Sequence, residues 1–383
     1  MDIEPIIYLD YNATTPVDPE VVNEMLPVFL SNYGNPSSDD HLAGWRAKEM
    51  VVASRKAIAA CIAVKNQDII FTAGATEAIN LVLRGMYLTS NNQPKHLITV
   101  VTEHKAVLDT CTVLESNGIS IDYLQVDTNG IIDLNELTSA IIKDTYLVSV
   151  MMVNNETGVM QPIKEIASIC KKEGILFMSD TTQAIGKMPV NKNDLGIDIL
   201  VGSAHKFYGP KGVGFLCAKA DILKEIEPII TGGGQERGIR AGTTDVPAIV
   251  GMSTALGICL DSLKEDTERI TSLRQRFETQ LANKISIKII GVGAKRLYNV
   301  ANISFSGVDS ERLMQAIGSK VAASRGSACS SDKIEASHVL TAMGILEEEA
   351  LSSIRFSFGR YTTEKEVDTA LELITEAVSR IKN

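Results

Sequence analysis

Between about residues 68 and 217, short apolar runs rich in β-branched residues alternate with segments in which apolar residues recur at helical spacing. The helical segments include Glu77–Tyr87, Ala106–Leu114 and Ile163–Lys172. This alternation predicts an α/β domain with a mostly parallel sheet, helices on both faces and ligands beyond the carboxyl ends of the strands. The runs expected to form its seven strands are Ile69–Phe71, Leu97–Val101, Ile121–Gln125, Tyr146–Val153, Ile175–Ser179, Ile199–Val201 and Val213–Cys217.

The pattern changes after about residue 246, where long helical stretches replace the strict alternation. Strand-like runs follow at Val300–Phe305 and Ile354–Phe358, with an irregular segment at Ala322–Ser331 between them. Thr363 and Glu366 have the spacing of a capping box and precede a long amphipathic helix. These features predict a smaller α+β domain.

We therefore expect two domains in the 383 residues. The larger one is predicted to span residues 16–250. The smaller one is predicted to combine residues 1–15 with 251–383 and to carry a loop at 322–333.

Composition narrows the class of protein. The chain is 45% hydrophobic and 22% charged, which is typical of a globular protein, and its net charge of -10 without basic clusters argues against direct nucleic-acid binding. The uncharged stretch Val246–Leu260 is too short to span a membrane, and the N-terminus lacks a signal-peptide pattern. Six scattered cysteines without a C-x-x-C pair indicate reduced thiols, and no residue cluster has the spacing of a metal site. We expect a cytoplasmic protein without a metal.

Candidate chemistry lies where the predicted strands end. Ser203, His205 and Lys206 follow one buried run, and a lysine held against an apolar sheet end can form a Schiff base, although a surface lysine is the ordinary alternative. Asp180 ends another run. A carboxylate there fits a salt bridge or a helix cap as well as it fits a partner for a pyridinium nitrogen.

Three further features are suggestive. The small residues at Gly74–Thr76 lie between a strand and a helix, where backbone N–H groups can bind a phosphate, although an ordinary turn has the same pattern. His104 lies at another strand end. Cys329 lies in a small polar segment beside Arg325, whereas the other five cysteines lie in apolar patterns typical of inert core thiols. Together with Gln183, these residues form the set that a pyridoxal phosphate site uses.

The motifs resemble those of the cysteine desulfurases of the NifS/IscS type, which are fold type I pyridoxal phosphate-dependent transferases. The resemblance covers nearly the whole chain. It rests on the motifs Tyr8–Pro16, Gly34–His41, Thr72–Glu77, Val153–Gly158, Ser203–Lys206, Gly232–Arg237, Arg240–Thr243 and Ser327–Cys329. Arg325 stands where a small residue is usual, and the sequence ends at Asn383, where iron–sulfur members carry a further tail.

The resemblance implies a role for each matching residue. Lys206 would bind the cofactor covalently, Asp180 its pyridine nitrogen and Gln183 its phenolate oxygen, with His104 stacked on the ring. Cys329 would attack the substrate sulfur. The phosphate would be held by Ala75, Thr76, Ser203 and His205 together with Thr243 of a second subunit, and the substrate by Asn12, Asn155 and Arg355.

The activity implied is conversion of L-cysteine to L-alanine, with sulfur left on Cys329 as a persulfide. A homodimer would then pass the sulfur to an acceptor protein in iron–sulfur cluster assembly, tRNA thiolation or DNA phosphorothioation. An aminotransferase of the same fold remains the alternative, since it would keep Lys206 and Asp180 without needing Cys329. A non-enzymatic docking subunit is disfavoured because both residues are present.

Overall fold

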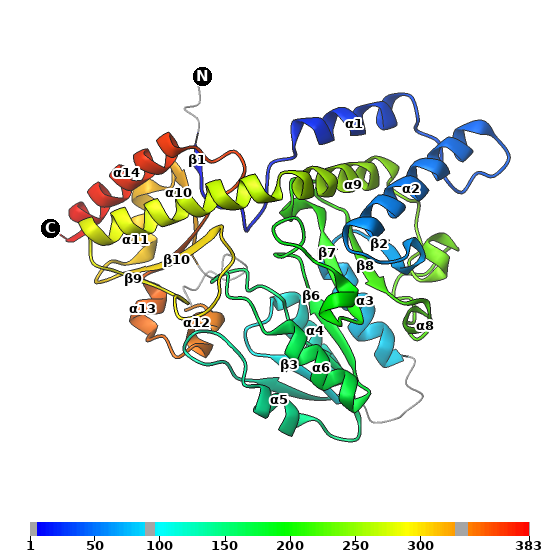
Figure 1. Ribbon diagram of the computed structural model, residues 1–383, viewed down its shortest axis with the longest axis horizontal. Helices are drawn as coiled ribbons and strands as arrows, with labels where there is room; N and C mark the ends of the chain where they lie inside the picture. The colour runs from blue at the N-terminus through cyan, green and yellow to red at the C-terminus, as the bar shows by residue number, and fades with distance from the viewer. Residues whose placement is uncertain (1–5, 89–95, 326–335, 383) are drawn as a thin grey trace.

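The computed structural model describes residues 6–88, 96–325 and 336–382 (Figure 1). Its largest feature is a seven-stranded sheet in the order β2-β8-β7-β6-β5-β3-β4. Each strand predicted between residues 68 and 217 takes part in it. The strands are β2 (Ile69–Thr72), β3 (His96–Val100), β4 (Ser120–Leu124), β5 (Thr145–Ser149), β6 (Leu176–Asp180), β7 (Ile199–Ser203) and β8 (Gly214–Ala218).

The sheet is mixed but mostly parallel, because β8 alone among its strands runs antiparallel to its neighbours β2 and β7. Successive side chains of a strand enter different cores: Leu97 and Met178 pack with α3 and α4, whereas Ile98 and Phe177 pack on the opposite face with α2, α6 and α9. The predicted α/β layering is confirmed. The helices around the sheet are α1 (Pro19–Leu30), α2 (Leu42–Cys61), α3 (Ala75–Leu88), α4 (Lys105–Ser116), α5 (Leu134–Ala140), α6 (Ile163–Glu173), α7 (Lys192–Leu195), α8 (Ala220–Leu223) and α9 (Val246–Asp261).

A second core lies at the other end of the molecule in Figure 1, around the four-stranded sheet β12-β13-β10-β9. Strand β10 has the predicted limits, and the predicted capping box forms: Glu366 N–H donates to Thr363 Oγ1 over 3.2 Å, and Thr363 N–H donates to Glu366 Oε2 over 2.8 Å. This part contains α10 (Leu263–Lys284), β9 (Ile287–Ile289), β10 (Val300–Phe305), α11 (Ser310–Ile317), β12 (Ser324–Arg325), α12 (His338–Ala342), α13 (Glu347–Leu351), β13 (Ser353–Ser357) and α14 (Glu364–Lys382). A parallel pair, β1 (Ile7–Tyr8) and β11 (Val321–Ala322), lies beside it.

The strand expected at Tyr146–Val153 is shorter than predicted, because β5 ends at Ser149. Beyond that point the chain is still buried, and the N–H groups of Val150 and Met152 still donate to carbonyls of β6. The Met151 N–H between them donates to a side chain, Glu103 Oε1. Burial of this segment in the first core therefore gives the same apolar signal as a strand.

No single helix of the described residues is long and apolar enough to cross a membrane, and the pair α9 and α10, which passes that test together, is bent by 72°. Helix α9 packs with α1 and α2 in the first core, whereas α10 packs in the second. We propose that the boundary between the two domains lies at this bend, near Ser262, close to the expected limit at residue 250.

Candidate active site

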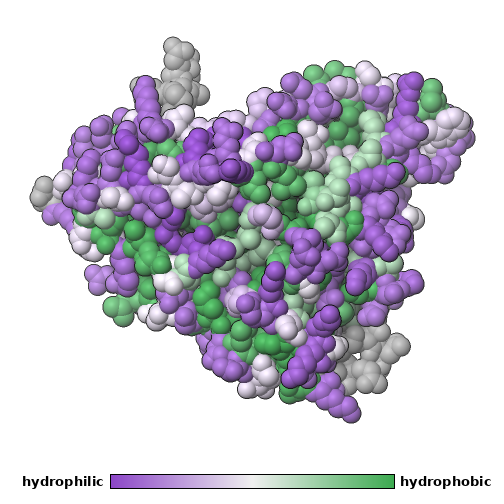
Figure 2. Space-filling view, viewed as in Figure 1, coloured by the Kyte–Doolittle hydropathy of each residue, from purple (hydrophilic) through white to green (hydrophobic). Residues whose placement is uncertain are grey.

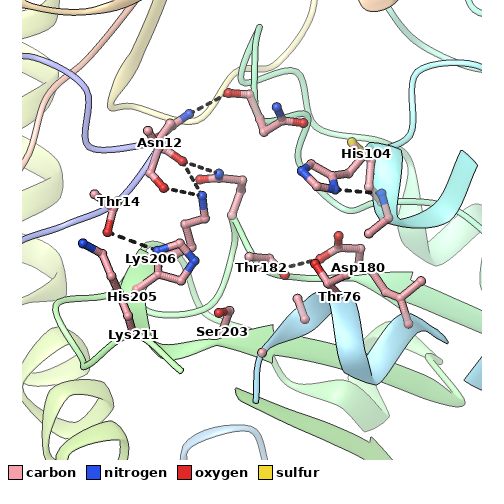
Figure 3. A pocket seen from close by; sticks show the side chains of 18 of the residues that line it. Asn12, Thr14, Thr76, His104, Asp180, Thr182, Ser203, His205, Lys206 and Lys211 are labelled. Carbon is pink, nitrogen blue, oxygen red and sulfur yellow. Dashed lines mark hydrogen bonds between the residues drawn. The ribbon is translucent and has the colours of Figure 1, made fainter. Parts of the chain in front are cut away.

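A cavity of about 810 Å³ opens at the carboxyl ends of the parallel strands, where the alternation of elements predicts it (Figure 3). Its size is typical of a small-molecule site. It brings together Asn12, Ala75, Thr76, His104, Asn155, Asp180, Gln183, Ser203, His205, Lys206 and Arg355. Of the remaining candidates, Cys329 lies outside the described residues, and Thr243 is exposed and does not line the cavity.

Lys206 reaches the cavity from the short helical turn Ala204–Lys206 that directly follows β7. Its Nζ donates to the carbonyl oxygens of Asn12 and Ala13, each over 2.7 Å. The N-terminal segment therefore holds the amine in place from across the cavity, as Figure 3 shows for Asn12. Two carbonyl acceptors thus fix the position of the amine.

Asp180, the last residue of β6, is buried, with 8% of its surface exposed. Its Oδ1 accepts a hydrogen bond from the Thr182 N–H over 2.9 Å. Within residues 6–88, 96–325 and 336–382, no basic side chain lies within 4.0 Å of its carboxylate, so the salt bridge left open by the sequence does not form here. A buried carboxylate beside a cavity is costly unless a cation or a proton donor meets it.

His104 is fixed as the N-cap of α4, where its Nδ1 accepts a hydrogen bond from the Ala106 N–H over 3.0 Å. The ring lines the cavity. Burial by the surrounding protein atoms lowers the pKa of His104, and the negative charge of the nearby Asp180 only partly opposes this shift. The imidazole is therefore neutral near pH 7 and can stack on a flat ring.

Another part of the cavity lies where the N-terminus of α3 meets the end of β7, and we call it the anion cradle because backbone N–H groups there can bind an anion. A Cβ added to Gly74 would lie 3.6 Å from the Ser203 hydroxyl oxygen, so the glycine keeps the space beside that hydroxyl open. His205 bonds Thr14 Oγ1 through its Nδ1 over 3.1 Å, and burial followed by the nearby Lys206 lowers its pKa to about 4. It is thus a neutral hydrogen-bonding group in this cradle.

The third part of the cavity is built around Arg355 of β13, which is 6% exposed. Its guanidinium donates to Asp10 Oδ1 over 2.7 Å and to the Asn155 carbonyl over 3.1 Å. The Asn12 amide donates to the same carbonyl over 3.0 Å. A fixed, buried guanidinium of this kind suits recognition of a carboxylate.

These residues fit a phosphate-bearing pyridoxal group. One cavity is lined by an amine for its aldehyde, a buried carboxylate for its ring nitrogen, a flat neutral ring and an anion cradle. The Thr182 hydroxyl beside Asp180 is buried without a hydrogen-bond partner among the described residues. The donor set and the space beside Gly74 agree with such a ligand.

Several lining residues were not singled out from the sequence. Lys211 lies in the glycine-rich turn five residues after Lys206, so the spacing of two lysines in one loop could have indicated it. Thr14, Thr182 and Ser324 carry no sequence signal of their own, since they reach the cavity only through the packing of distant segments.

Comparison with known proteins agrees with this site. The aminotransferase class-V family model matches residues 7–370. The cysteine desulfurase IscS of Rickettsia felis is 46% identical over 98% of this chain and 92% of its own length. A solved NifS-like protein superposes with a TM-score of 0.92 at 37% identity, covering 98% of this chain and all of its own, and a structure of SspA in complex with cysteine does so with 0.82 at 33%, covering 93% and 99%.

The chain therefore belongs to the aminotransferase class-V family, whose fold its seven-stranded sheet shares. Within that family it belongs to the cysteine desulfurases of the NifS/IscS type, and it is an enzyme. Both the resemblance and the fold class predicted from the sequence are confirmed.

Proposed function

We propose that the chain is a pyridoxal phosphate-dependent homodimer that converts L-cysteine to L-alanine and retains the sulfur on Cys329. The observation that carries this proposal is the pairing of Lys206 with the buried Asp180 in one cavity, without a basic partner for the carboxylate within the described residues. The bound cofactor would act as an electron sink for the bond changes at the substrate. SspA, a structural relative, has been solved in complex with cysteine, which supports the substrate.

The protein's own groups have distinct tasks in this proposal. Lys206 holds the cofactor covalently and then removes the Cα proton of cysteine, while Asp180 keeps the ring nitrogen protonated. Gln183 binds the phenolate oxygen and His104 stacks on the ring. Ala75, Thr76, Ser203 and His205, with Thr243 of the second subunit, hold the phosphate.

Arg355, Asn155 and Asn12 grip the substrate carboxylate at the other end of the cavity. The Cys329 thiolate then attacks the substrate sulfur. The bond between that sulfur and Cβ breaks, its electron pair goes to the carbon, and the carbon takes up a proton to give alanine. The sulfur stays on Cys329 as a persulfide, so the step needs no external oxidant.

Cys329 is supported as the sulfur carrier by two facts about the rest of the chain. Burial raises the pKa of each of the other five thiols, so these are protonated near pH 7. Ser324, five residues before Cys329, lines the cavity, and five residues of chain can span up to about 17 Å. The length of chain between Ser324 and Cys329 therefore supports the proposal that the Cys329 thiol acts at the substrate.

A homodimer is supported by apolar side chains that the single chain leaves exposed on and beside α1 and α2. Figure 2 shows apolar surface over this part of the molecule. The exposed side chains are Val22, Leu26, Phe29, Leu30, Tyr33, Leu42, Trp45 and Val52. The acceptor of the sulfur would be a protein in iron–sulfur cluster assembly, tRNA thiolation or DNA phosphorothioation, and the setting would be the cytoplasm.

Two variants test the proposal. Lys206→Ala is expected to lose the visible absorbance of the covalently bound cofactor, because it removes the amine proposed to hold it. Cys329→Ala is expected to keep that absorbance but to release alanine from cysteine at least about 100-fold more slowly. Absorbance after dialysis and alanine release are the two measurements. Alanine release at the wild-type rate by Cys329→Ala would contradict the nucleophile assignment, and transamination of a keto acid would favour the aminotransferase alternative.

A further inference from the structure

A second lysine, Lys187, lies behind the cavity rather than in its wall. It belongs to the turn that follows β6, and its side chain is buried, with 6% of the residue exposed. Its Nζ donates to Gln183 Oε1 over 2.7 Å. In the part of the chain that the structure describes, no carboxylate lies within 4.0 Å of this ammonium nitrogen. A buried lysine without a counter-ion is costly, and a purely structural role would be filled better by an apolar side chain.

The hydrogen bond from Lys187 determines how Gln183 is oriented. Because the amide oxygen of Gln183 accepts from Lys187, its amide nitrogen must point the other way, and it donates to the Asn12 carbonyl over 3.0 Å. The same carbonyl accepts from Lys206 Nζ over 2.7 Å. A continuous set of hydrogen bonds thus joins the two lysines through Gln183 and Asn12.

The turn that carries Lys187 is packed directly against the chain after Lys206. Gly186 has a φ of +77°, and a Cβ added to it would come within 2.5 Å of the Cβ of Phe207. Only a residue without a side chain allows this approach. The backbone positions from which the two lysine side chains extend are therefore set by close packing.

We propose that Lys187 is a positioning residue for the cofactor: it turns the N–H groups of Gln183 toward the cavity and, when protonated, places a positive charge behind the nitrogen of Lys206. This inference rests on the proposed function, since it concerns the lysine that would hold the cofactor. Lys187 would then influence the protonation of the Lys206 nitrogen from outside the cavity wall.

The charges around Lys187 support this role. Burial, followed by the nearby Lys206, lowers the pKa of Lys187 to about 7, and Arg355 acts in the same direction. Cys259 acts in the opposite direction, but burial raises the pKa of its thiol to about 12, and the thiol donates to the Phe207 carbonyl. The neutral thiol supplies no compensating charge near pH 7, so the two lysines oppose each other's protonation.

The test uses the cofactor-loaded enzyme and follows its visible absorbance against pH, which reports the proton on the Lys206 nitrogen. Lys187→Met is expected to raise the midpoint by about one pH unit, because it removes both a nearby positive charge and the group that orients Gln183. Lys192→Met is the matched control. Lys192 is also a buried lysine, 2% exposed, whose pKa is lowered by burial, but none of the charged groups around it lines the cavity. Its midpoint is expected to equal that of the wild type.

The outcomes separate this inference from the proposed function. A wild-type enzyme without visible absorbance would overturn the proposed function itself. A folded Lys187→Met enzyme with the wild-type midpoint, or a Lys192→Met enzyme shifted equally, would overturn the role of Lys187 alone. If Lys187→Met does not fold, Lys187→Gln, which keeps a donor for Gln183 but no charge, is expected to show a smaller rise. An unchanged midpoint there would also overturn the role.

Discussion

At the scale of single residues, the proposed role of Arg355 in substrate binding can be tested directly. Its guanidinium is held by Asp10 and by the Asn155 carbonyl, so this planar group is fixed in the lining of the cavity. Arg355→Lys keeps the charge but loses the paired donors. We expect the KM for L-cysteine to rise about 10- to 100-fold, corresponding to the loss of one charge-assisted hydrogen bond. The visible absorbance of the cofactor is expected to stay unchanged, and a KM equal to that of the wild type would remove Arg355 from the substrate site.

The site residues that could be predicted from the sequence are those that lie next to a recognisable pattern of neighbouring residues. Asp180 ends one buried strand and Lys206 lies in the turn after another, and the rule that parallel strands end at one edge brings them together. Lys187 and Glu103 could not be predicted in this way. Both are charged residues buried by segments that are distant in sequence, and Glu103 bonds the Met151 N–H, 48 positions away. Such burial has no signature in the residues beside them.

At the scale of elements, the segment before Thr243 is held in an unusual conformation. Glu236 and Arg237 have positive φ values of 45° and 59°, which non-glycine residues rarely adopt. The Glu236 carboxylate holds this turn against β2 through two bonds from Arg55, of 2.6 and 2.8 Å, and one from the Phe71 N–H, of 2.9 Å. The buried pair therefore fixes the path of the chain toward Thr243.

Glu236→Ala is expected to lower the free energy of unfolding by about 3 kcal/mol, because it leaves the buried Arg55 without its partner. The matched control is Glu376→Ala, which breaks an exposed pair with Arg380 and is expected to cost less than about 1 kcal/mol. Thermal unfolding of both variants beside the wild type measures the difference. Equal losses would show that the turn does not depend on this pair.

Strand positions were predictable at this scale because continuous β-branched runs lie buried on both faces of a parallel sheet. The overestimate at Tyr146–Val153 shows the limit of that signal. Val150 to Val153 are as buried as β5, and Val150 and Met152 still donate to β6, but the Met151 N–H donates to the Glu103 side chain. Apolar character reports burial, and burial alone does not distinguish a strand from a covered loop.

At the scale of the whole molecule, the cavity joins segments from Asn12 to Arg355, so it exists only when both cores are folded. Arg360 connects the two halves through bonds to Asp266 Oδ2, over 2.9 Å, and Asp18 Oδ2, over 3.2 Å. The contribution of the N-terminal segment, including the two carbonyls that hold Lys206, was indicated only by the resemblance to a family. No periodicity or spacing relates residues so far apart in the chain.

Thr243 provides the strongest test of the assembly, since it is exposed and outside the cavity of its own chain. If it serves the phosphate of a second subunit, a heterodimer of Lys206→Ala and Thr243→Glu chains contains one intact site. That site combines the Lys206 of the second chain with the Thr243 of the first. Each parent homodimer is expected to be inactive, because it lacks the amine or carries a repelling carboxylate at the phosphate. The purified heterodimer is expected to regain about half of the wild-type alanine release, one site of two.

The matched control pairs Lys206→Ala with Asp180→Ala, two residues that line the same cavity of one chain. That heterodimer has one site without the amine and one without the carboxylate, so it is expected to stay inactive whichever way the subunits are arranged. Recovery in the first heterodimer but not in the second requires that Thr243 acts across the dimer. If neither recovers while both are dimeric and folded, Thr243 does not act on the partner's site, and the phosphate must be held from within one chain.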